Sequence, residues 1–348
     1  MNVATILRRA VPYVLAVLAA FAVTAVLIAL LGHDPLEAFR AVLTNSFRNT
    51  FGMVQTLHKW TALTLLALAF AIPLGAGRFN IGGEGQLILG AVGAVAVGIT
   101  FSELPLLVLL PLLLVSAVLA GAVWAWIAAW LMDRFRVNEI LSTVLLNFVS
   151  FEILDYLASY TWPDVGAGGA VTLPIGAGGE LPTIGRPPMH VGVVLVVILV
   201  IALAFLARRS VPGFELRAVG LNERAAALHG IRTRRVAVGS MVVGGALAGL
   251  AGGIEVAGVH HRMLEGIQSN YLLLGIIIGL IARGSLVALP FVAFGIAVLE
   301  VGAGSMQRVS GAPAELVLIL EGLILLFILM SDVVVGRVSA RRARVAVT

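Results

Sequence analysis

The chain has 348 residues, of which 60% are hydrophobic and only 12% are charged. Soluble domains carry about 25% charged residues, so this composition excludes an ordinary soluble protein and indicates one that lies in a membrane. The absence of cysteine excludes disulfides, thiolate metal sites and cysteine nucleophiles. The single lysine, Lys59, follows a histidine and not a glycine-rich turn, so the chain has no Walker A motif and any ATP hydrolysis requires another subunit.

Ten apolar runs predict about ten transmembrane helices. The first, residues 10–31, follows Arg8 and Arg9 and covers about 33 Å, enough to cross a hydrocarbon core of about 30 Å. A cleavable signal has a shorter core, so we expect a retained helix. Residues 32–55 are partly amphipathic and predict a short interfacial helix outside the membrane. The other nine runs lie at about residues 56–77, 82–100, 104–131, 139–160, 190–207, 235–258, 270–282, 286–303 and 312–331.

The arginines predict the orientation of these helices. With the N-terminus inside, the inner segments hold 17 of the 23 basic residues. This distribution obeys the positive-inside rule and predicts that both termini are cytoplasmic. The net charge of +5 is therefore an orientation signal spread over the ends of loops, and we expect no nucleic-acid binding.

A polar, glycine-rich stretch at residues 79–86 interrupts an otherwise apolar region. It contains Asn80, Glu84, Gln86 and three glycines, just past Arg78 at the inner end of a predicted helix. Polar side chains and irregular backbone persist in lipid only where they face protein or a water-filled path. The stretch predicts a turn where two membrane helices meet, with the glycines permitting close backbone approach. Its polar groups either line the inner part of a pathway or tie the turn to the helix at 139–160.

A polar stripe is predicted on that helix. Glu139, Thr143 and Asn147 are spaced by four residues and so share one face, with Ser142 beside them. Such a stripe faces the protein interior, where it either forms interhelical hydrogen bonds or lines a path for a polar solute. The candidate pathway residues are Asn80, Glu84, Gln86, Thr143 and Asn147.

The predicted outer loop at residues 161–189 contains seven glycines and five prolines. This composition disfavours both helix and central strand. The loop is either a long connector or a surface for an external partner.

The predicted inner loop at residues 208–235 has seven arginines and two glutamates. We interpret Pro212-Gly213 as a turn. Asn222 is a suitable N-cap, Glu223 suits the positive end of a helix, and Gly230 suits the C′ position. The helix between them, at 223–229, is too short to be stable alone. It is either a frayed helix in a solvated loop or a helix that docks in a cleft of a cytoplasmic subunit.

The run at residues 235–258 predicts close helix packing, because Gly245, Gly249 and Gly253 repeat at a spacing of four. Near its end, Glu255 precedes His260 and His261. Carboxylates of this kind in a membrane either have a structural role or take part in proton-coupled transport.

Three motifs resemble one family of membrane proteins. The first is the stretch 213–222 with Ala225-Ala226 and Gly230-Ile231, which resembles the cytoplasmic loop of ABC importer permeases. The stretch 80–86 resembles the most recognisable motif of the family that takes up ribose-type sugars, branched-chain amino acids and nucleosides. The third motif is 138–147, and the resemblance covers residues 55–331.

Within this family, the chain most resembles the larger permease of nucleoside systems. The features are the long outer loop, the stretch 249–258 and Met306-Gln307 before Pro313. The segments 272–274 and 282–286 depart from the family pattern.

The resemblance implies an all-α polytopic membrane protein, a single transmembrane domain over residues 1–348 with its core at 10–331, in the inner membrane of a bacterium. It also implies that an ATPase docks on the loop at 208–235. The coupling residues expected there are Gly213, Glu215, Arg217, Gly220, Asn222, Ala225, Ala226 and Gly230.

The implied function is ATP-driven import of nucleosides by alternating access, with no covalent chemistry on this chain. The implied partners are a cytoplasmic ATPase that binds ATP and Mg²⁺, a second permease, in a heterodimer rather than a homodimer, and an extracytoplasmic solute-binding lipoprotein. The alternatives are a ribose-type monosaccharide permease and, from another class, an ion-coupled secondary carrier that uses the membrane carboxylates.

Overall fold

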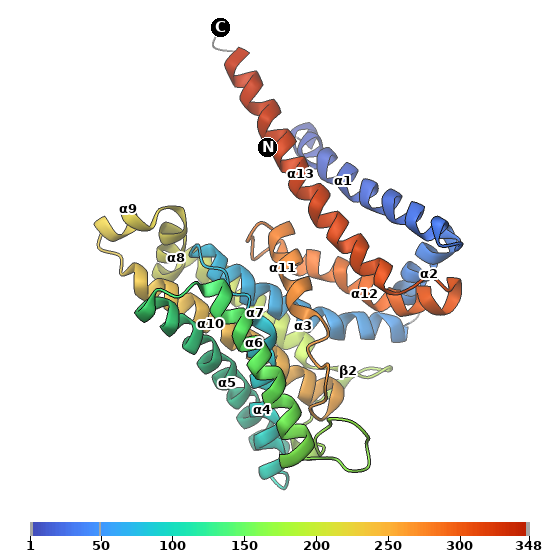
Figure 1. Ribbon diagram of the computed structural model, residues 1–348, viewed down its shortest axis with the longest axis vertical. Helices are drawn as coiled ribbons and strands as arrows, with labels where there is room; N and C mark the ends of the chain where they lie inside the picture. Colours follow the sequence, from blue (N-terminus) through green and yellow to red (C-terminus); the bar gives the residue numbers. More distant parts are fainter. Residues whose placement is uncertain (1–2, 49, 346–348) are drawn as a thin grey trace. The chain divides into compact units, whose positions relative to one another are not determined.

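The computed structural model describes residues 3–48 and 50–345 and is almost entirely helical (Figure 1). The chain divides into two compact units, one formed by residues 1–56 and 295–348 and the other by residues 57–294. Among the described helices, eight are long and apolar enough to cross a membrane, and they include the first predicted span. The prediction of an all-α polytopic membrane protein is therefore confirmed.

The first unit contains the two ends of the chain. Its elements are α1 (Val3–Leu30), α2 (Pro35–Arg48), the start of α3 (Thr50–Gly75), most of α12 (Leu289–Ser310) and α13 (Glu315–Val345). Helix α1 lies along α13 (Figure 1). Helix α2 begins where the sequence predicts a short amphipathic helix, because Asp34 accepts hydrogen bonds from the N–H groups of Leu36 and Glu37 and Pro35 occupies the first turn, where its missing N–H costs nothing.

The second unit contains the remaining helices and both short strands. Besides most of α3 and the first residues of α12, its helices are α4 (Gly83–Thr100), α5 (Leu106–Phe135), α6 (Glu139–Tyr156), α7 (Gly192–Arg209), α8 (Val211–Leu221), α9 (Glu223–Leu228), α10 (Thr233–Glu255) and α11 (Tyr271–Ile281). The strands β1 (Thr183–Ile184) and β2 (Met189–His190) pair antiparallel in the outer loop. Single π-helical turns follow α6, at Leu157–Thr161, and α10, at Val256–His260.

Helix α10 of the second unit packs against both α4 and α5, which also pack against each other. The predicted close packing is confirmed there. A Cβ atom at Gly249 would overlap the carbonyl of Ala117 and the backbone of Gly121, and one at Gly245 would overlap Ala125. The glycines thus let two helix backbones approach directly, as small residues do in membrane helix pairs.

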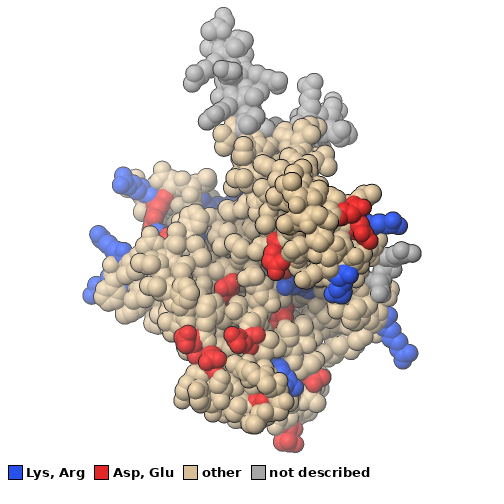
Figure 2. Space-filling view, turned by 45° about the vertical axis from the view of Figure 1, so that its right-hand side comes forward, with Lys and Arg blue, Asp and Glu red and all other residues tan. Residues whose placement is uncertain are grey.

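The outward surface of the second unit is apolar, as lipid requires. Large side chains of α5 are strongly exposed, among them Leu107, Leu119 and Val123. Figure 2 shows a surface that belongs mostly to residues other than Lys, Arg, Asp and Glu. Exposed aliphatic side chains cost little when the surrounding solvent is hydrocarbon.

The ten predicted apolar runs all coincide with helices, but not all with simple spans. Helix α11 has eleven residues and is about 17 Å long, too short to cross a bilayer alone. It is followed by a turn in which Arg283 and Gly284 adopt positive φ angles of 52° and 67°. This irregular turn falls in the segment 282–286, where the sequence departs from the family pattern.

Candidate functional site

The polar stretch between α3 and α4 forms a turn closed by paired side-chain amides. Asn80 Nδ2 donates to Gln86 Oε1 at 2.9 Å, and Gln86 Nε2 donates back to Asn80 Oδ1 at 2.8 Å. Asn80 also donates to the carbonyl of Ala69 in α3 at 3.2 Å and accepts from the N–H of Gly82 at 3.2 Å. Both amide side chains are buried. The pair therefore fixes the exit of α3 against the entry of α4.

Asn147 ties this turn to α6. Its Oδ1 accepts from the N–H of Gly85 at 2.9 Å, and its Nδ2 donates to the carbonyl of Ile81 at 2.9 Å. Gly82 forms the N-cap position of α4 without a side-chain cap, so a residue of another helix satisfies an otherwise orphaned donor. A Cβ at Gly85 would press on Asn147, Ser150 and Trp124, so only glycine permits this approach. The predicted tie between the turn and the helix at 139–160 is present.

The other two predicted pathway residues lie beside the turn. Thr143 is buried, and its hydroxyl donates to the carbonyl of Glu139 in its own helix at 2.7 Å. Glu84 lies in the first turn of α4 and is only half-buried, with its carboxylate against the backbone of Leu272. Four of the five predicted residues are thus enclosed by protein, and Glu84 is the most exposed. A direct contact of these residues with a solute stays a prediction.

The prediction of a turn at Pro212-Gly213 is wrong, because both residues lie within α8. Ser210 caps this helix by accepting from the N–H of Gly213 at 3.3 Å, and proline occupies the first turn, where it is tolerated. Gly213 packs on the backbone of Ala207, and Arg217 donates to the Ala207 carbonyl. Helix α8 is therefore fastened to the end of α7, with the half-buried Glu215 near its middle.

The predicted short helix is present as α9. Asn222 caps it by accepting from the N–H of Ala225 at 3.0 Å, and Gly230 ends it with a φ of 83°, in the left-handed region that favours glycine. Ala226 faces inward and is buried, whereas Leu228 is 89% exposed. The capping prediction is confirmed, and the helix presents an apolar side chain to the outside.

The comparison with known sequences places the chain in a family. Residues 52–329 match the family described as the permease component of branched-chain amino acid transport systems. The chain belongs to this family. It is a multi-pass permease subunit of an ABC transport system, as the sequence motifs and the apolar helices indicated.

Several characterised relatives align with nearly all of the permease. A glucose ABC transporter permease of Haloferax volcanii is 36% identical over 93% of this chain and 90% of its own length. A guanosine ABC transporter permease of Bacillus subtilis is 30% identical over 91% of this chain and 92% of its own. A nucleoside ABC transporter permease of Lactococcus lactis is 26% identical over 94% of this chain and 92% of its own.

The permease also contains a polar cluster that the sequence did not predict. It lies near the start of α3 and at the end of α10. The rings of His58 and His190 stack with centroids 4.0 Å apart, and the backbone N–H of His190 donates to His58 Nε2 at 3.2 Å. Nearby, Tyr271 donates to the buried carboxylate of Glu255 at 3.2 Å, and His260 lies 3.4 Å from the same carboxylate. Only the pairing of Glu255 with His260 could be suspected from sequence proximity.

Burial changes the ionisation of His190, which lies just before the membrane-spanning part of α7. The side chain is fully enclosed. Loss of hydration lowers its pKa to about 4, and the neighbouring His58 adds to this effect. His190 is therefore neutral at pH 7.

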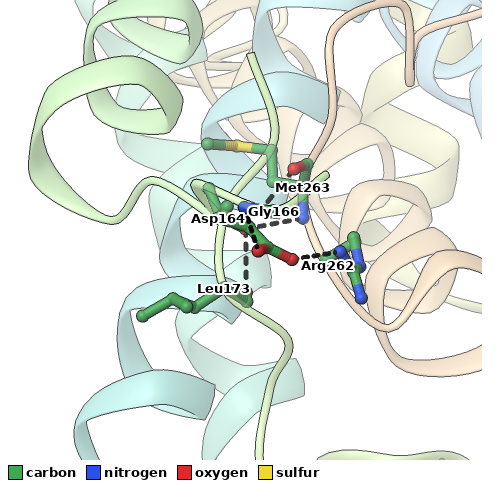
Figure 3. A network of polar contacts seen from close by, with 6 residues as sticks. Asp164, Gly166, Leu173, Arg262 and Met263 are labelled. Atoms are coloured by element: carbon green, nitrogen blue, oxygen red, sulfur yellow. Dashed lines mark hydrogen bonds and ion pairs between the residues drawn. The ribbon is translucent and has the colours of Figure 1, made fainter. Parts of the chain in front are cut away.

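The outer loop of the permease is held firmly against the segment that follows α10 (Figure 3). Asp164 forms an ion pair with Arg262 at 2.7 Å and accepts from the N–H of Gly166. Thr172 and Met263 exchange hydrogen bonds through their backbones and the threonine hydroxyl. These contacts show that the loop is an ordered structure, while its role as a surface for an external partner stays a prediction.

Proposed function

We propose that the permease moves nucleosides across the inner membrane by alternating access. The observation that supports this substrate is that two relatives named for guanosine or nucleosides each align with more than nine-tenths of this chain. The fold supports transport because its buried amides and carboxylates lie in helices otherwise built of apolar residues, the arrangement expected along solute paths.

The energy for transport comes from a separate ATPase subunit that binds ATP and Mg²⁺ and docks on α8 and α9. Leu221 is the last residue of α8 and Leu228 is the last residue of α9, and their side chains are 88% and 89% exposed. A six-residue helix has too few hydrogen bonds to be stable alone. A cleft on the ATPase that received these leucines would remove them from water and hold the helix. A second, homologous permease completes the membrane part as a heterodimer, and an extracytoplasmic lipoprotein delivers the solute.

A monosaccharide permease is the second candidate, and the glucose-named relative at 36% identity supports it. The two solute classes share ring hydroxyls, so hydrogen-bonding side chains alone do not separate them. A nucleoside adds a flat base, which stacks on aromatic rings.

The test is uptake by proteoliposomes that contain the permease with its ATPase and second permease, supplied with the binding lipoprotein. Labelled guanosine should enter only when ATP is present, and unlabelled glucose should not compete. Uptake of glucose with no uptake of guanosine would replace the nucleoside proposal with the sugar one. Uptake that continued without the ATPase, or collapsed with an uncoupler at constant ATP, would favour an ion-coupled carrier.

A further inference from the structure

The α3–α4 turn touches the cytoplasmic helices at a point where backbone meets backbone. A Cβ atom at Gly220, near the end of α8, would overlap the carbonyl of Gly75 at the end of α3. On the neighbouring turn of α8, the side chain of Leu216 packs against the same Gly75. At Gly220, therefore, no side chain separates α8 from the end of α3. A displacement of α8 there presses directly on α3.

Next to this contact, an ion pair joins the start of α9 to the residues that follow α3. Arg78 Nη2 donates to both carboxylate oxygens of Glu223, at 3.1 and 3.0 Å. The arginine side chain is 23% exposed and the glutamate side chain is 50% exposed. Glu223 is the first residue of α9, next to its cap Asn222. The ion pair therefore holds the start of the exposed helix to the turn.

Arg78 lies only two residues before Asn80, whose amide closes the turn. From Asn80, hydrogen bonds lead to Gln86 in α4 and to Ala69 in α3. Asn147 of α6 is bonded to the same turn at Ile81 and Gly85. The ion pair of Arg78 at the start of α9 is thus connected, through two residues of backbone, to hydrogen bonds that reach three membrane helices.

We propose that Arg78 and Glu223 are positioning residues that transmit movement of α9 to the α3–α4 turn and so to α4 and α6. The inference rests on the proposed function, because it takes the ATPase to dock on α8 and α9. The ion pair suits this role because the arginine contacts both oxygens of one carboxylate. It also lies beside the Gly75–Gly220 contact, where the backbones of α3 and α8 cannot move closer together.

Two simpler roles give different expectations. Arg78 acts as an orientation charge if its only function is to stay on the inner side, and Glu223 acts as a helix-dipole partner if its only function is to stabilise α9. In both cases the double charge exchange would not restore the transport per ATP that a single charge reversal removes. Exposed ion pairs contribute little to stability, so loss of the pair should leave insertion and subunit assembly intact.

The experiment is a charge-exchange cycle in the complete complex, reconstituted with ATPase, second permease and binding lipoprotein. The variants are Arg78→Glu, Glu223→Arg and the double exchange. Solute molecules transported per ATP hydrolysed are measured with guanosine and with glucose, and assembly is measured by copurification of the ATPase. Each single reversal should lower transport per ATP about fivefold or more, the lower end of typical coupling between sites. The double exchange should return it to within about twofold of the wild type.

A matched control uses the ion pair between Arg234 of α10 and Asp133 of α5, in the same unit. Asp133 lies outside the loop at 208–235 on which the ATPase docks, so Asp133→Arg should leave transport per ATP within about twofold of the wild type. The inference is overturned if both single reversals leave coupling unchanged, or if the double exchange is as impaired as the worse single variant. A wild-type complex that fails to couple ATP hydrolysis to uptake of either solute would overturn the proposed function as well, which separates the two failures.

Discussion

Replacing Asn147 with leucine should destabilise the permease by about 2–4 kcal/mol. The change keeps the branching and the number of heavy atoms of the side chain but removes both hydrogen bonds to the turn, at 2.9 Å each, and leaves the N–H of Gly85 and the carbonyl of Ile81 without their partner. An unsatisfied buried polar group costs about 1–3 kcal/mol, and hydrogen bonds between membrane helices are worth about 0.6–2 kcal/mol. The estimate takes the lower half of the first range, about 1–2 kcal/mol, for each of the two groups left unsatisfied.

The assay is unfolding of the purified permease in mixed micelles by increasing sodium dodecyl sulfate, followed by tryptophan fluorescence. Asn147→Asp should lose at least as much stability as Asn147→Leu, because the carboxylate still accepts from Gly85 but sets a buried negative charge against the carbonyl of Ile81. Thr143→Val is the matched control, one turn earlier on α6. Its hydroxyl donates to the carbonyls of Glu139 and Ile140, both in its own helix, so its loss should cost under about 1 kcal/mol. Equal stability of Asn147→Leu and wild type would refute the role of this side chain in holding the turn.

Four further outcomes are expected. Gly249→Leu should destabilise the permease by about 1–3 kcal/mol or more in the same unfolding assay, because the side chain would overlap the backbone of α5; unchanged stability would mean that α5 and α10 separate at little cost. Gly220→Leu should reduce solute-stimulated ATP hydrolysis severalfold while membrane insertion stays normal, and full stimulation would argue against docking through α8. Glu84→Gln should lower uptake without releasing the ATPase, and normal uptake would remove Glu84 from the pathway. Because burial lowers the pKa of His190 to about 4 from 6.5, the unfolded chain binds more protons between these values, so stability should fall by up to about 3 kcal/mol as pH drops through this window. His190→Gln should remove that part of the pH dependence, and an unchanged pH profile would show that His190 is not its source.

Local signals in the sequence were sufficient for some of these features. The cap at Asn222 and the left-handed glycine at Gly230 predicted α9, because capping depends on neighbours within a few residues. The same kind of signal was available for α8, since Ser210 precedes a proline that is tolerated in the first turn, but Pro212-Gly213 also suits a turn. That ambiguity is physical, as both residues are common at helix starts and in turns.

Contacts between distant residues could not be predicted in the same way. The stripe on α6 correctly indicated that Thr143 and Asn147 face the protein interior, because it depends only on helical periodicity. Nothing in the sequence showed that Asn147 would bond to the backbone at Ile81 and Gly85, more than 60 residues away. The stacking of His58 on His190 depends likewise on how α3 and the outer loop meet in space.

The hydrogen bonds of the turn constrain how a solute can use it. Asn80, Gln86 and Asn147 direct their amide groups to one another or to the backbone around them, and all three are buried. A solute that bonded to these amides would have to replace protein partners that are already well placed, at a cost comparable to the bonds gained. Glu84 is less enclosed, because it is half-buried and reaches the side of the turn that faces α11, where its carboxylate lies against the backbone of Leu272. The amides therefore suit a rigid joint whose movement changes access, and Glu84 is the member of the group best placed to meet a solute in this conformation.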